Sequence, residues 1–180
     1  MRLFYDTEFV EDGRTIDLLS IGMVNEAGDE YYAVVEDLAL ITRAAANPWL
    51  RENVLSSLPV REYYTDDGGT RWDWWPDHRD FDRVKTRDGI ADDVRGFVLS
   101  HPNPQLWAWY AAYDHVALAQ LFGRMIDLPD GIPMFTCDLK QECVRLGDPR
   151  VPEQQDGVHN ALADARHNRV IAKFLDGIDA

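Results

Sequence analysis

Residues 2–35 read RLFYDTEFVEDGRTIDLLSIGMVNEAGDEYYAVV, three largely apolar segments separated by two short polar turns. Residues 2–8 alternate in character, so that their side chains would point in turn to the two faces of a strand. Residues 16–24 form a long apolar run and residues 31–35 a shorter one, and a Gly-containing turn precedes each. The pattern predicts a β-meander of three antiparallel strands at the start of the chain.

The rest of the chain alternates between helical and strand patterns. One buried strand is expected at residues 105–110. Helix boundaries are indicated by Pro48 in a first turn, and by Gly123 and Gly147 after last turns. The expected helices cover residues 47–58, 90–99, 114–122, 138–146 and 159–175. A meander followed by alternating helices and strands predicts an α/β fold, with a mixed sheet and helices on its faces.

A segment of mixed charge, residues 59–88, interrupts this order and contains Trp72, Trp74 and Trp75. We interpret it as an irregular insertion or hairpin within a single domain that covers residues 1–180, because the chain length suits one well-buried core. Three interpretations of the tryptophans stay open. They stack on unpaired bases, form a subunit contact such as a homodimer, or anchor a long loop to its own domain.

The chain of 180 residues carries a formal net charge of −14. Non-specific nucleic-acid affinity comes from cationic contacts, so this charge argues against a broad surface that coats DNA or RNA. It permits a cleft that takes one strand end, because bound divalent cations reverse the local sign of clustered carboxylates. No apolar run reaches the roughly 20 residues of a membrane helix. The N-terminus lacks a signal-peptide pattern and the only thiols are Cys137 and Cys143, so we expect a cytoplasmic protein without membrane contact.

Asp6 and Glu8 lie two residues apart in the first expected strand, so both carboxylates would emerge on one face. Two like charges placed together repel each other unless a proton or a cation lies between them. The simple alternative is an edge strand whose outer face is wet. Phe4 shares the face of the two carboxylates, which weakens that alternative.

Asp164 lies on the packed side of the last expected helix, in a stripe of small and apolar residues. Burial of an unpaired carboxylate is costly, so Asp164 needs a partner. A salt bridge to an arginine is one alternative, and a metal ion is the interpretation that we favour.

Asp114 and His159 are less informative individually. Asp114 follows the buried strand and opens the next helix, where a role as N-cap would explain it. His159 precedes Asp164 by five residues, an offset of about 140° on a helix, so the two would not share a helical face. His159 is therefore either an exposed residue beside a helix start or a residue that reaches the cleft from a loop or first turn.

Together, three segments resemble the motifs of the DEDDh 3′-5′ exonuclease family in their order, spacing and structural settings. The segments are Asp6-Thr7-Glu8, Ala112-Tyr113-Asp114 and His159-Asn160-Ala161-Leu162-Ala163-Asp164. FYDTEFVEDGRTI at residues 4–16 and LWAWYAAYDHVAL at residues 106–118 look like a narrower group, the small actinobacterial 3′-5′ exoribonucleases. The resemblance does not extend over residues 59–88. It implies a ribonuclease-H-like fold, in which the antiparallel meander is joined by parallel strands and flanked by helices.

The resemblance also implies a reaction that uses two divalent cations, Mg²⁺ or Mn²⁺. Such cations prefer carboxylate oxygens, and a pair of them activates a water and stabilises the leaving oxygen of a phosphoryl displacement. Asp6 would bridge the two cations, Glu8 and Asp164 would complete the first site, and Asp114 would hold the second. His159 would act as the general base that takes the proton from the attacking water.

Substrate contacts are expected from Thr7 and from Phe9, which would stack on the terminal base or sugar; core packing is the alternative for Phe9. The wider family often has Thr and Gly after the first motif, where this chain has Phe9-Val10-Glu11.

The expected activity is that of a 3′-5′ exoribonuclease, which acts on a single-stranded or overhanging RNA 3′ end and releases nucleoside 5′-monophosphates. One alternative is a DNA-directed exonuclease of the proofreading type. Another is a catalytically silent module that binds nucleotides or RNA, although none of the four carboxylates is missing. A third is an oligomeric interaction protein whose contact surface is the tryptophan-rich insertion.

Overall fold

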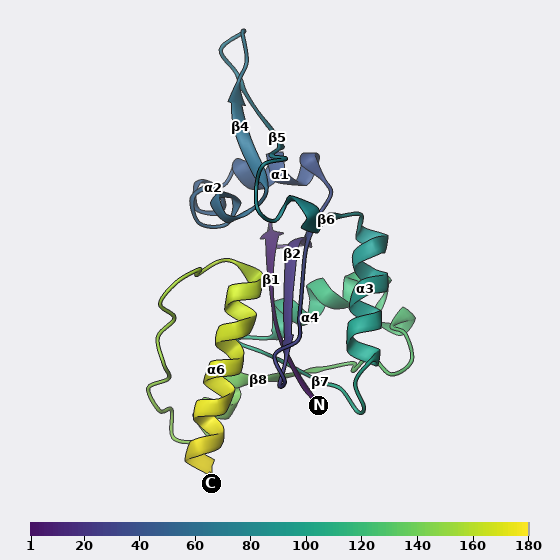
Figure 1. Cartoon of the computed structure of the whole chain (residues 1–180), viewed down its shortest axis with the longest axis vertical. Helices are drawn as coiled ribbons and strands as arrows, with labels where there is room; N and C mark the ends of the chain where they lie inside the picture. Colours follow the sequence, from purple (N-terminus) through teal and green to yellow (C-terminus); the bar gives the residue numbers. More distant parts are fainter. Residues whose placement is uncertain (180) are drawn as a thin grey trace.

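The computed structural model describes residues 1–179, and its main element is a mixed β-sheet (Figure 1). The strands of this sheet are β1 (Arg2–Glu11), β2 (Ile16–Asn25), β3 (Glu30–Val35), β6 (Val84–Lys85), β7 (Gln105–Ala108) and β8 (Thr136–Asp138). The strand order is β6-β3-β2-β1-β7-β8. β1, β2 and β3 pair antiparallel, whereas β7 is parallel to β1, β8 to β7, and β6 to β3. The predicted meander and the predicted ribonuclease-H-like α/β fold are confirmed.

Helices cover both faces of the sheet. They are α3 (Arg87–Leu99) and α4 (Ala112–Ala119) on one face, and α5 (Leu139–Arg145) and α6 (Ala161–Asp179) on the other. The alternation in β1 explains how one strand serves both layers. Leu3 and Tyr5 join the core beneath α3 and α4, and Phe4 joins the core beneath α5 and α6.

A third cluster of buried residues lies at the end of the sheet from which a hairpin projects (Figure 1). Its elements are α1 (Leu38–Ala45), α2 (Pro48–Asn53), the 3₁₀ turn η1 (Leu55–Ser57), and the hairpin strands β4 (Val60–Tyr64) and β5 (Thr70–Trp74). Trp72 and Trp74 pack against this cluster, so both contact the chain's own core. Trp75 is 37% exposed.

Several elements differ from their expected bounds. The helix expected at 47–58 is shorter, because α2 ends at Asn53 and a 3₁₀ turn follows. The strand expected at 105–110 ends at Ala108, and Tyr110 adopts a φ of 53° that a strand cannot contain. α1 and β8 were not expected. Three further 3₁₀ turns are η2 (Phe81–Arg83), η3 (Gln120–Phe122) and η4 (Met125–Asp127).

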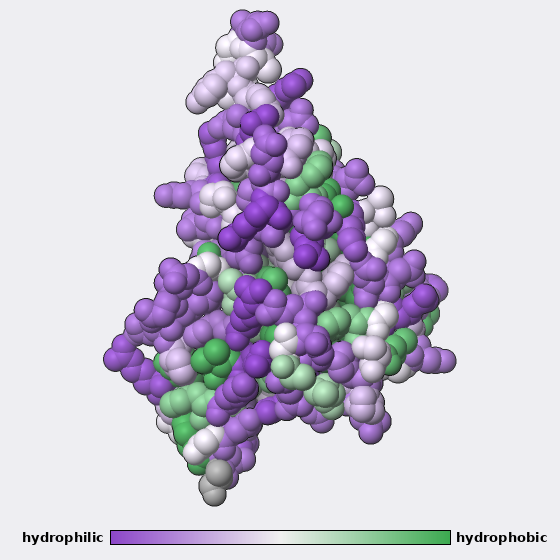
Figure 2. Space-filling model, viewed as in Figure 1, coloured by the Kyte–Doolittle hydropathy of each residue, from purple (hydrophilic) through white to green (hydrophobic). Residues whose placement is uncertain are grey.

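The face of the molecule shown in Figure 2 is mainly hydrophilic, with hydrophobic side chains in scattered groups. None of the helices within residues 1–179 has the length and apolar character needed to cross a membrane.

Candidate active site

One cavity of about 400 Å³ is lined by all five residues of the expected catalytic set. It lies where β1, the first turns of α4 and α6, and helix α2 come together. The five are Asp6, Glu8, Asp114, His159 and Asp164, and the other lining residues include Thr7, Phe9, Trp49, Tyr110 and Tyr113. Three segments that are far apart in the sequence therefore meet at one cleft.

Asp6 and Glu8 lie in β1 beyond residues 2–4, which pair with β7, and both pair with β2. Glu8 is buried, so the alternative of a wet outer face is wrong. Asp6 pairs across the ladder with Gly22 and Glu8 with Ser20, and Glu8 is only 8% exposed. Within the described residues, neither carboxylate accepts a hydrogen bond or meets a cationic side chain.

The surroundings of these two carboxylates oppose ionisation. Burial, and after it the charges of Asp164 and Asp114, raise the pKa of Glu8 to about 8. Burial, and after it the charges of Asp114, Glu8 and Asp164, raise the pKa of Asp6 well above its usual range. Both groups therefore favour a bound proton or a bound cation over the free anion.

Asp114 is the third residue of α4, because the helix begins at Ala112. Its interpretation as an N-cap is therefore wrong; Ala111 occupies that position, and its N–H donates to Oδ2 of Asp138 at 3.0 Å. Oδ1 of Asp114 accepts two hydrogen bonds from Thr7. Burial raises the pKa of Asp114 to about 6, even though the bonds from Thr7 lower it.

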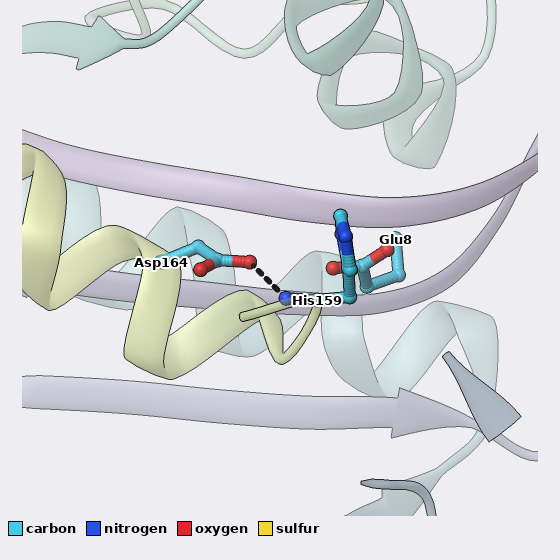
Figure 3. Close-up of side chains that lie close together, drawn as sticks. All are labelled: Glu8, His159 and Asp164. Carbon is cyan, nitrogen blue, oxygen red and sulfur yellow. Dashed lines mark hydrogen bonds between the residues drawn. The ribbon is translucent and has the colours of Figure 1, made fainter. Parts of the chain in front are cut away.

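Asp164 lies in the first turn of α6 and is held by two donors. Nε2 of Gln154 donates to Oδ1 at 2.6 Å, and the backbone N–H of His159 donates to Oδ2 at 2.9 Å (Figure 3). Burial raises the pKa of Asp164, and these two hydrogen bonds lower it. No arginine among residues 1–179 forms a salt bridge with Asp164, so the salt-bridge alternative is wrong.

His159 lies outside the helix, with a φ of 65°, two residues before α6 begins. Its ring meets Trp49 edge-on, with centroids 4.7 Å apart, and its carbonyl oxygen accepts a hydrogen bond from Oγ of Ser57 at 3.3 Å. These contacts fix the loop, and the imidazole lies beside Glu8 and Asp164 (Figure 3). His159 is not part of the helix, so the angular offset of about 140° that two residues of one helix would have does not separate it from Asp164.

The residues of the cleft fit a divalent cation. One ligand atom from each of Glu8, His159 and Asp164 lies within 4.8 Å of the other two. This limit is close to the roughly 4 Å between opposite ligands of a Mg²⁺ ion. Glu8 lacks a cationic partner in the described part of the chain, and a buried charge without a partner is costly. Asp6 and Asp114 line the same cavity and supply further oxygen ligands.

An aromatic pair forms another part of the cleft. The rings of Phe9 and Tyr113 stack, with centroids 6.0 Å apart and an interplanar angle of 10°. Tyr113 is 52% exposed and Trp49, on α2, is 51% exposed, so flat apolar surface is available beside the carboxylates. Surface of this kind suits stacking of an unpaired nucleobase.

The residues that position this cleft carried little signal in the sequence. Trp49 follows a helix-starting Asn-Pro pair and looked like an ordinary helical residue. Gln154 belongs to a polar loop, and only the folded chain brings it to Asp164. Asp138 lies at an expected helix start, and its Oδ1 accepts a hydrogen bond from the backbone N–H of Lys140 there. Its Oδ2 accepts a hydrogen bond from the backbone N–H of Ala111, just before the helix that carries Asp114, and the sequence did not indicate this contact.

Comparison with known proteins adds two findings. The family model described as the 3′-5′ exoribonuclease Rv2179c-like domain matches residues 1–175. The 3′-5′ exoribonuclease Rv2179c of Mycobacterium tuberculosis strain H37Rv is 42% identical over 168 residues, which cover 92% of this chain and 88% of that protein. The 3′-5′ exoribonuclease MT2234.1 of strain CDC 1551 matches with the same identity and coverage.

Proposed function

The chain belongs to the family of 3′-5′ exoribonuclease Rv2179c-like domains, and we propose that its cleft hydrolyses RNA from the 3′ end and releases nucleoside 5′-monophosphates. Membership of this family makes the chain a nuclease, and an exoribonuclease acts on RNA. The observation that carries the proposal is the convergence of Asp6, Glu8, Asp114, His159 and Asp164 on one cavity.

We assign the four carboxylates to two divalent cations, Mg²⁺ or Mn²⁺. Asp6 is shared between the two positions, Glu8 and Asp164 belong to the first, and Asp114 belongs to the second. Bound there, the cations supply an activated water and neutralise charge on the phosphoryl oxygens. The raised pKa values of Asp6 and Glu8 support this assignment, because anions crowded in this way need a positive counter-charge.

We assign His159 as the general base, which accepts a proton from the attacking water on an imidazole nitrogen. No group within residues 1–179 forms a hydrogen bond with either ring nitrogen, so the ring is free to take that proton. The neighbouring backbone is held by Asp164 and Ser57, which limits movement of the ring. The imidazole of His159 is also close enough to Glu8 and Asp164 to be a metal ligand. Removal of a metal ligand would weaken metal binding, whereas removal of a general base would not.

The substrate is a single-stranded or overhanging RNA 3′ end, and the charge of the protein bears on how it binds. With a net charge of −14, the chain offers no excess of cations for a long phosphate track. Affinity would come from the cations at the cleft and from stacking on Phe9 and Tyr113. Thr7 lines the cleft, and its hydroxyl donates a hydrogen bond to Asp114.

We further propose that residues 1–180 form one exonuclease domain, active in the cytoplasm. The clusters beneath the two pairs of helices both include residues of β1 and β2, which supports a single folding unit. Cys137 and Cys143 are free thiols, in keeping with a reducing compartment.

The test is hydrolysis of matched 5′-labelled RNA and DNA oligonucleotides with Mg²⁺ or Mn²⁺, with and without EDTA. We expect RNA to shorten from its 3′ end in a ladder, to do so faster than DNA, and to stay intact in EDTA. Degradation of DNA at an equal or higher rate would favour the proofreading-type alternative. If RNA and DNA both stay intact with either metal, the remaining interpretation is a catalytically silent module that binds nucleotides or RNA.

A further inference from the structure

The first turn of α6 lies directly against the backbone of β2 at Gly22. A Cβ atom added at Gly22 would lie well inside 3.0 Å of backbone atoms of Leu162 and Ala161, a distance that real Cβ atoms essentially never show. Gly22 has no positive φ, so backbone conformation does not require a glycine at this position. Gly22 is required because there is no room for a side chain. The atoms that a Cβ would meet belong to the backbone of α6, so rotation of a neighbouring side chain cannot relieve the clash.

The place of this contact relates it to the cleft. Gly22 pairs with Asp6 across the β1–β2 ladder. On the other side of the contact, Leu162 precedes Asp164 by two residues and Ala161 follows His159 by two. The contact therefore lies between the carboxylates of the strand and the two cleft residues at the start of the helix.

The geometry points to Gly22 as a positioning residue for the metal site: its missing side chain lets α6 approach β2 closely enough for Asp164 and His159 to share a cation with Glu8. This inference rests on the function proposed above for the same cleft.

The effect of a methyl group at position 22 on the metal site follows from two lengths: the displacement of α6 that it causes, and the error in ligand position that a metal ion tolerates. An ordinary Cβ contact is 3.4–4 Å, so a methyl group at position 22 must displace the first turn of α6 by about an ångström. Metal sites tolerate ligand positions only within about 0.2 Å of their normal distances. The ligand atoms of Glu8, His159 and Asp164 lie within 4.8 Å of one another, and an outward shift of about an ångström at the first turn of α6 would make the cluster too wide for one ion.

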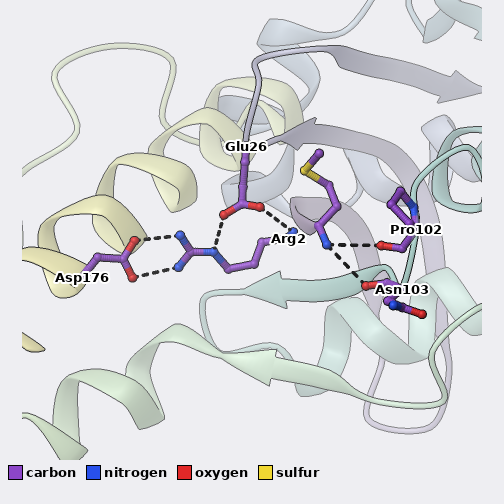
Figure 4. Close-up of polar contacts among 6 residues, drawn as sticks. Arg2, Glu26, Pro102, Asn103 and Asp176 are labelled. Carbon is purple, nitrogen blue, oxygen red and sulfur yellow. Dashed lines mark hydrogen bonds and ion pairs between the residues drawn. The ribbon is translucent and has the colours of Figure 1, made fainter.

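The far end of α6 is tied to the strand that carries Asp6 and Glu8. Arg2, in β1, forms two hydrogen bonds with Asp176 at 2.9 and 2.7 Å and two with Glu26, from its side chain at 2.8 Å and from its backbone N–H at 3.0 Å (Figure 4). The amino group of Met1 donates to the carbonyl oxygens of Pro102 and Asn103 (Figure 4). A methyl group at position 22 would therefore tilt the first turn outward while the last turns stay in place.

The experiment compares Gly→Ala substitutions at different places. A Cβ at Gly96, in α3, or at Gly177, in α6, meets nothing within 4 Å, and both residues are exposed. The double variant Gly96→Ala/Gly177→Ala is therefore the control, and it is also a stabilised host for Gly22→Ala, since alanine is favoured over glycine in a helix. Mn²⁺ affinity of the RNA-free protein is measured by calorimetry, and folding by circular dichroism and thermal unfolding.

We expect the host to bind Mn²⁺ like the wild type, and we expect Gly22→Ala in the host to stay folded with at least tenfold weaker Mn²⁺ affinity. Asp164→Glu, whose side chain is one methylene longer, should weaken Mn²⁺ binding in the host but recover part of it beside Gly22→Ala. A loss of stability alone would not make Asp164→Glu harmful in the host and helpful beside Gly22→Ala. The extra methylene only lets the carboxylate at position 164 extend further toward the cation.

Wild-type Mn²⁺ affinity in Gly22→Ala would overturn the inference, and so would a variant that cannot fold even in the host. Simple additivity of Gly22→Ala and Asp164→Glu would also overturn it. Failure of the proposed function looks different: there, the wild type and the host themselves would bind no Mn²⁺ or cleave no RNA.

Discussion

Thr7 donates both its backbone N–H and its hydroxyl to the same oxygen of Asp114, over 2.8 and 2.6 Å. Thr7 lies in β1 between Asp6 and Glu8, and the alternation of a strand turns its side chain to the opposite face. Three consecutive residues thus present two carboxylates toward α6 and hold a third on α4. The second oxygen, Oδ2 of Asp114, takes no part in these bonds.

Thr7→Val keeps the shape of the side chain but removes its hydroxyl, so Asp114 loses one of the two donors that orient it. The pKa of Asp114, raised to about 6 by burial, should rise further because the bonds from Thr7 lower it. Loss of such an orienting partner typically costs about 10- to 100-fold in metal affinity or activity. We expect that loss in calorimetric Mn²⁺ affinity and in kcat, with Thr7→Ser near the wild type. A raised KM with unchanged Mn²⁺ affinity would instead make Thr7 a substrate contact.

Asp6→Asn and Asp164→Asn should each reduce RNA hydrolysis by orders of magnitude, because each removes a negative charge from the metal site with little change of shape. Both variants should fold. The melting temperature of Asp6→Asn in EDTA should equal or exceed that of the wild type, since carboxylate repulsion is relieved. Asp164→Asn also loses one of the two hydrogen bonds that Asp164 accepts. Asp92→Asn, on the exposed side of α3, is the matched control and should behave like the wild type. Near-normal turnover by either site variant would contradict the assignment.

His159→Ala should lose about 10²- to 10⁴-fold in rate, the usual contribution of a general base, while Mn²⁺ affinity stays nearly intact. Calorimetry and rate measurements on the wild type and His159→Ala measure both effects, with His78→Ala, in the loop after β5, as a control. Lost Mn²⁺ affinity would make His159 a ligand, and an unchanged rate would make it a bystander.

The stability of the metal-free protein should fall as the pH rises from about 4.5 to about 8, the interval between the usual pKa of Glu8 and its raised value. In this interval the folded protein binds more protons than the unfolded chain, so raising the pH favours unfolding. Melting temperatures measured in EDTA across this range test the sign. Added Mn²⁺ should raise the melting temperature most at the alkaline end. Glu8→Gln should flatten the dependence in EDTA; an equal slope in that variant would place its origin elsewhere.

Local pattern predicted the strands of the meander and the strand β7, and it singled out Asp6, Glu8 and Asp164 as candidate site residues. The resemblance to the exonuclease family was needed for Asp114 and His159. The run Leu3-Phe4-Tyr5 places apolar side chains on both faces of β1, and both faces are buried in the structure. Asp6, the next residue, departs from this apolar pattern. Asp164 likewise stands out in an apolar stripe, and the structure places it in the cleft. A carboxylate in an apolar context is visible in the sequence because its burial is costly unless a partner compensates its charge.

The contacts that position the cleft depend on tertiary structure and were not predictable in this way. Thr7 and Asp114 are 107 residues apart, and nothing near either residue indicates the other. Gly22 looked like one small residue in an apolar run, since its role depends on a helix that the chain forms much later. β8 has only three residues, too few for a periodic pattern, and its pairing with β7 defines it.

The separation of Asp6 and Asp164 in the sequence also has a consequence for synthesis. A ribosome makes β1, which ends at Glu11, long before α6, which begins at Ala161. Synthesis starts at the N-terminal end, so the nascent chain carries Asp6 and Glu8 before Asp114 is made, and all three before His159 and Asp164. Gly22 and the Arg2–Asp176 pair can hold α6 in place only once that helix has been released. The cleft is therefore complete only after α6 has been synthesised and has packed against β2.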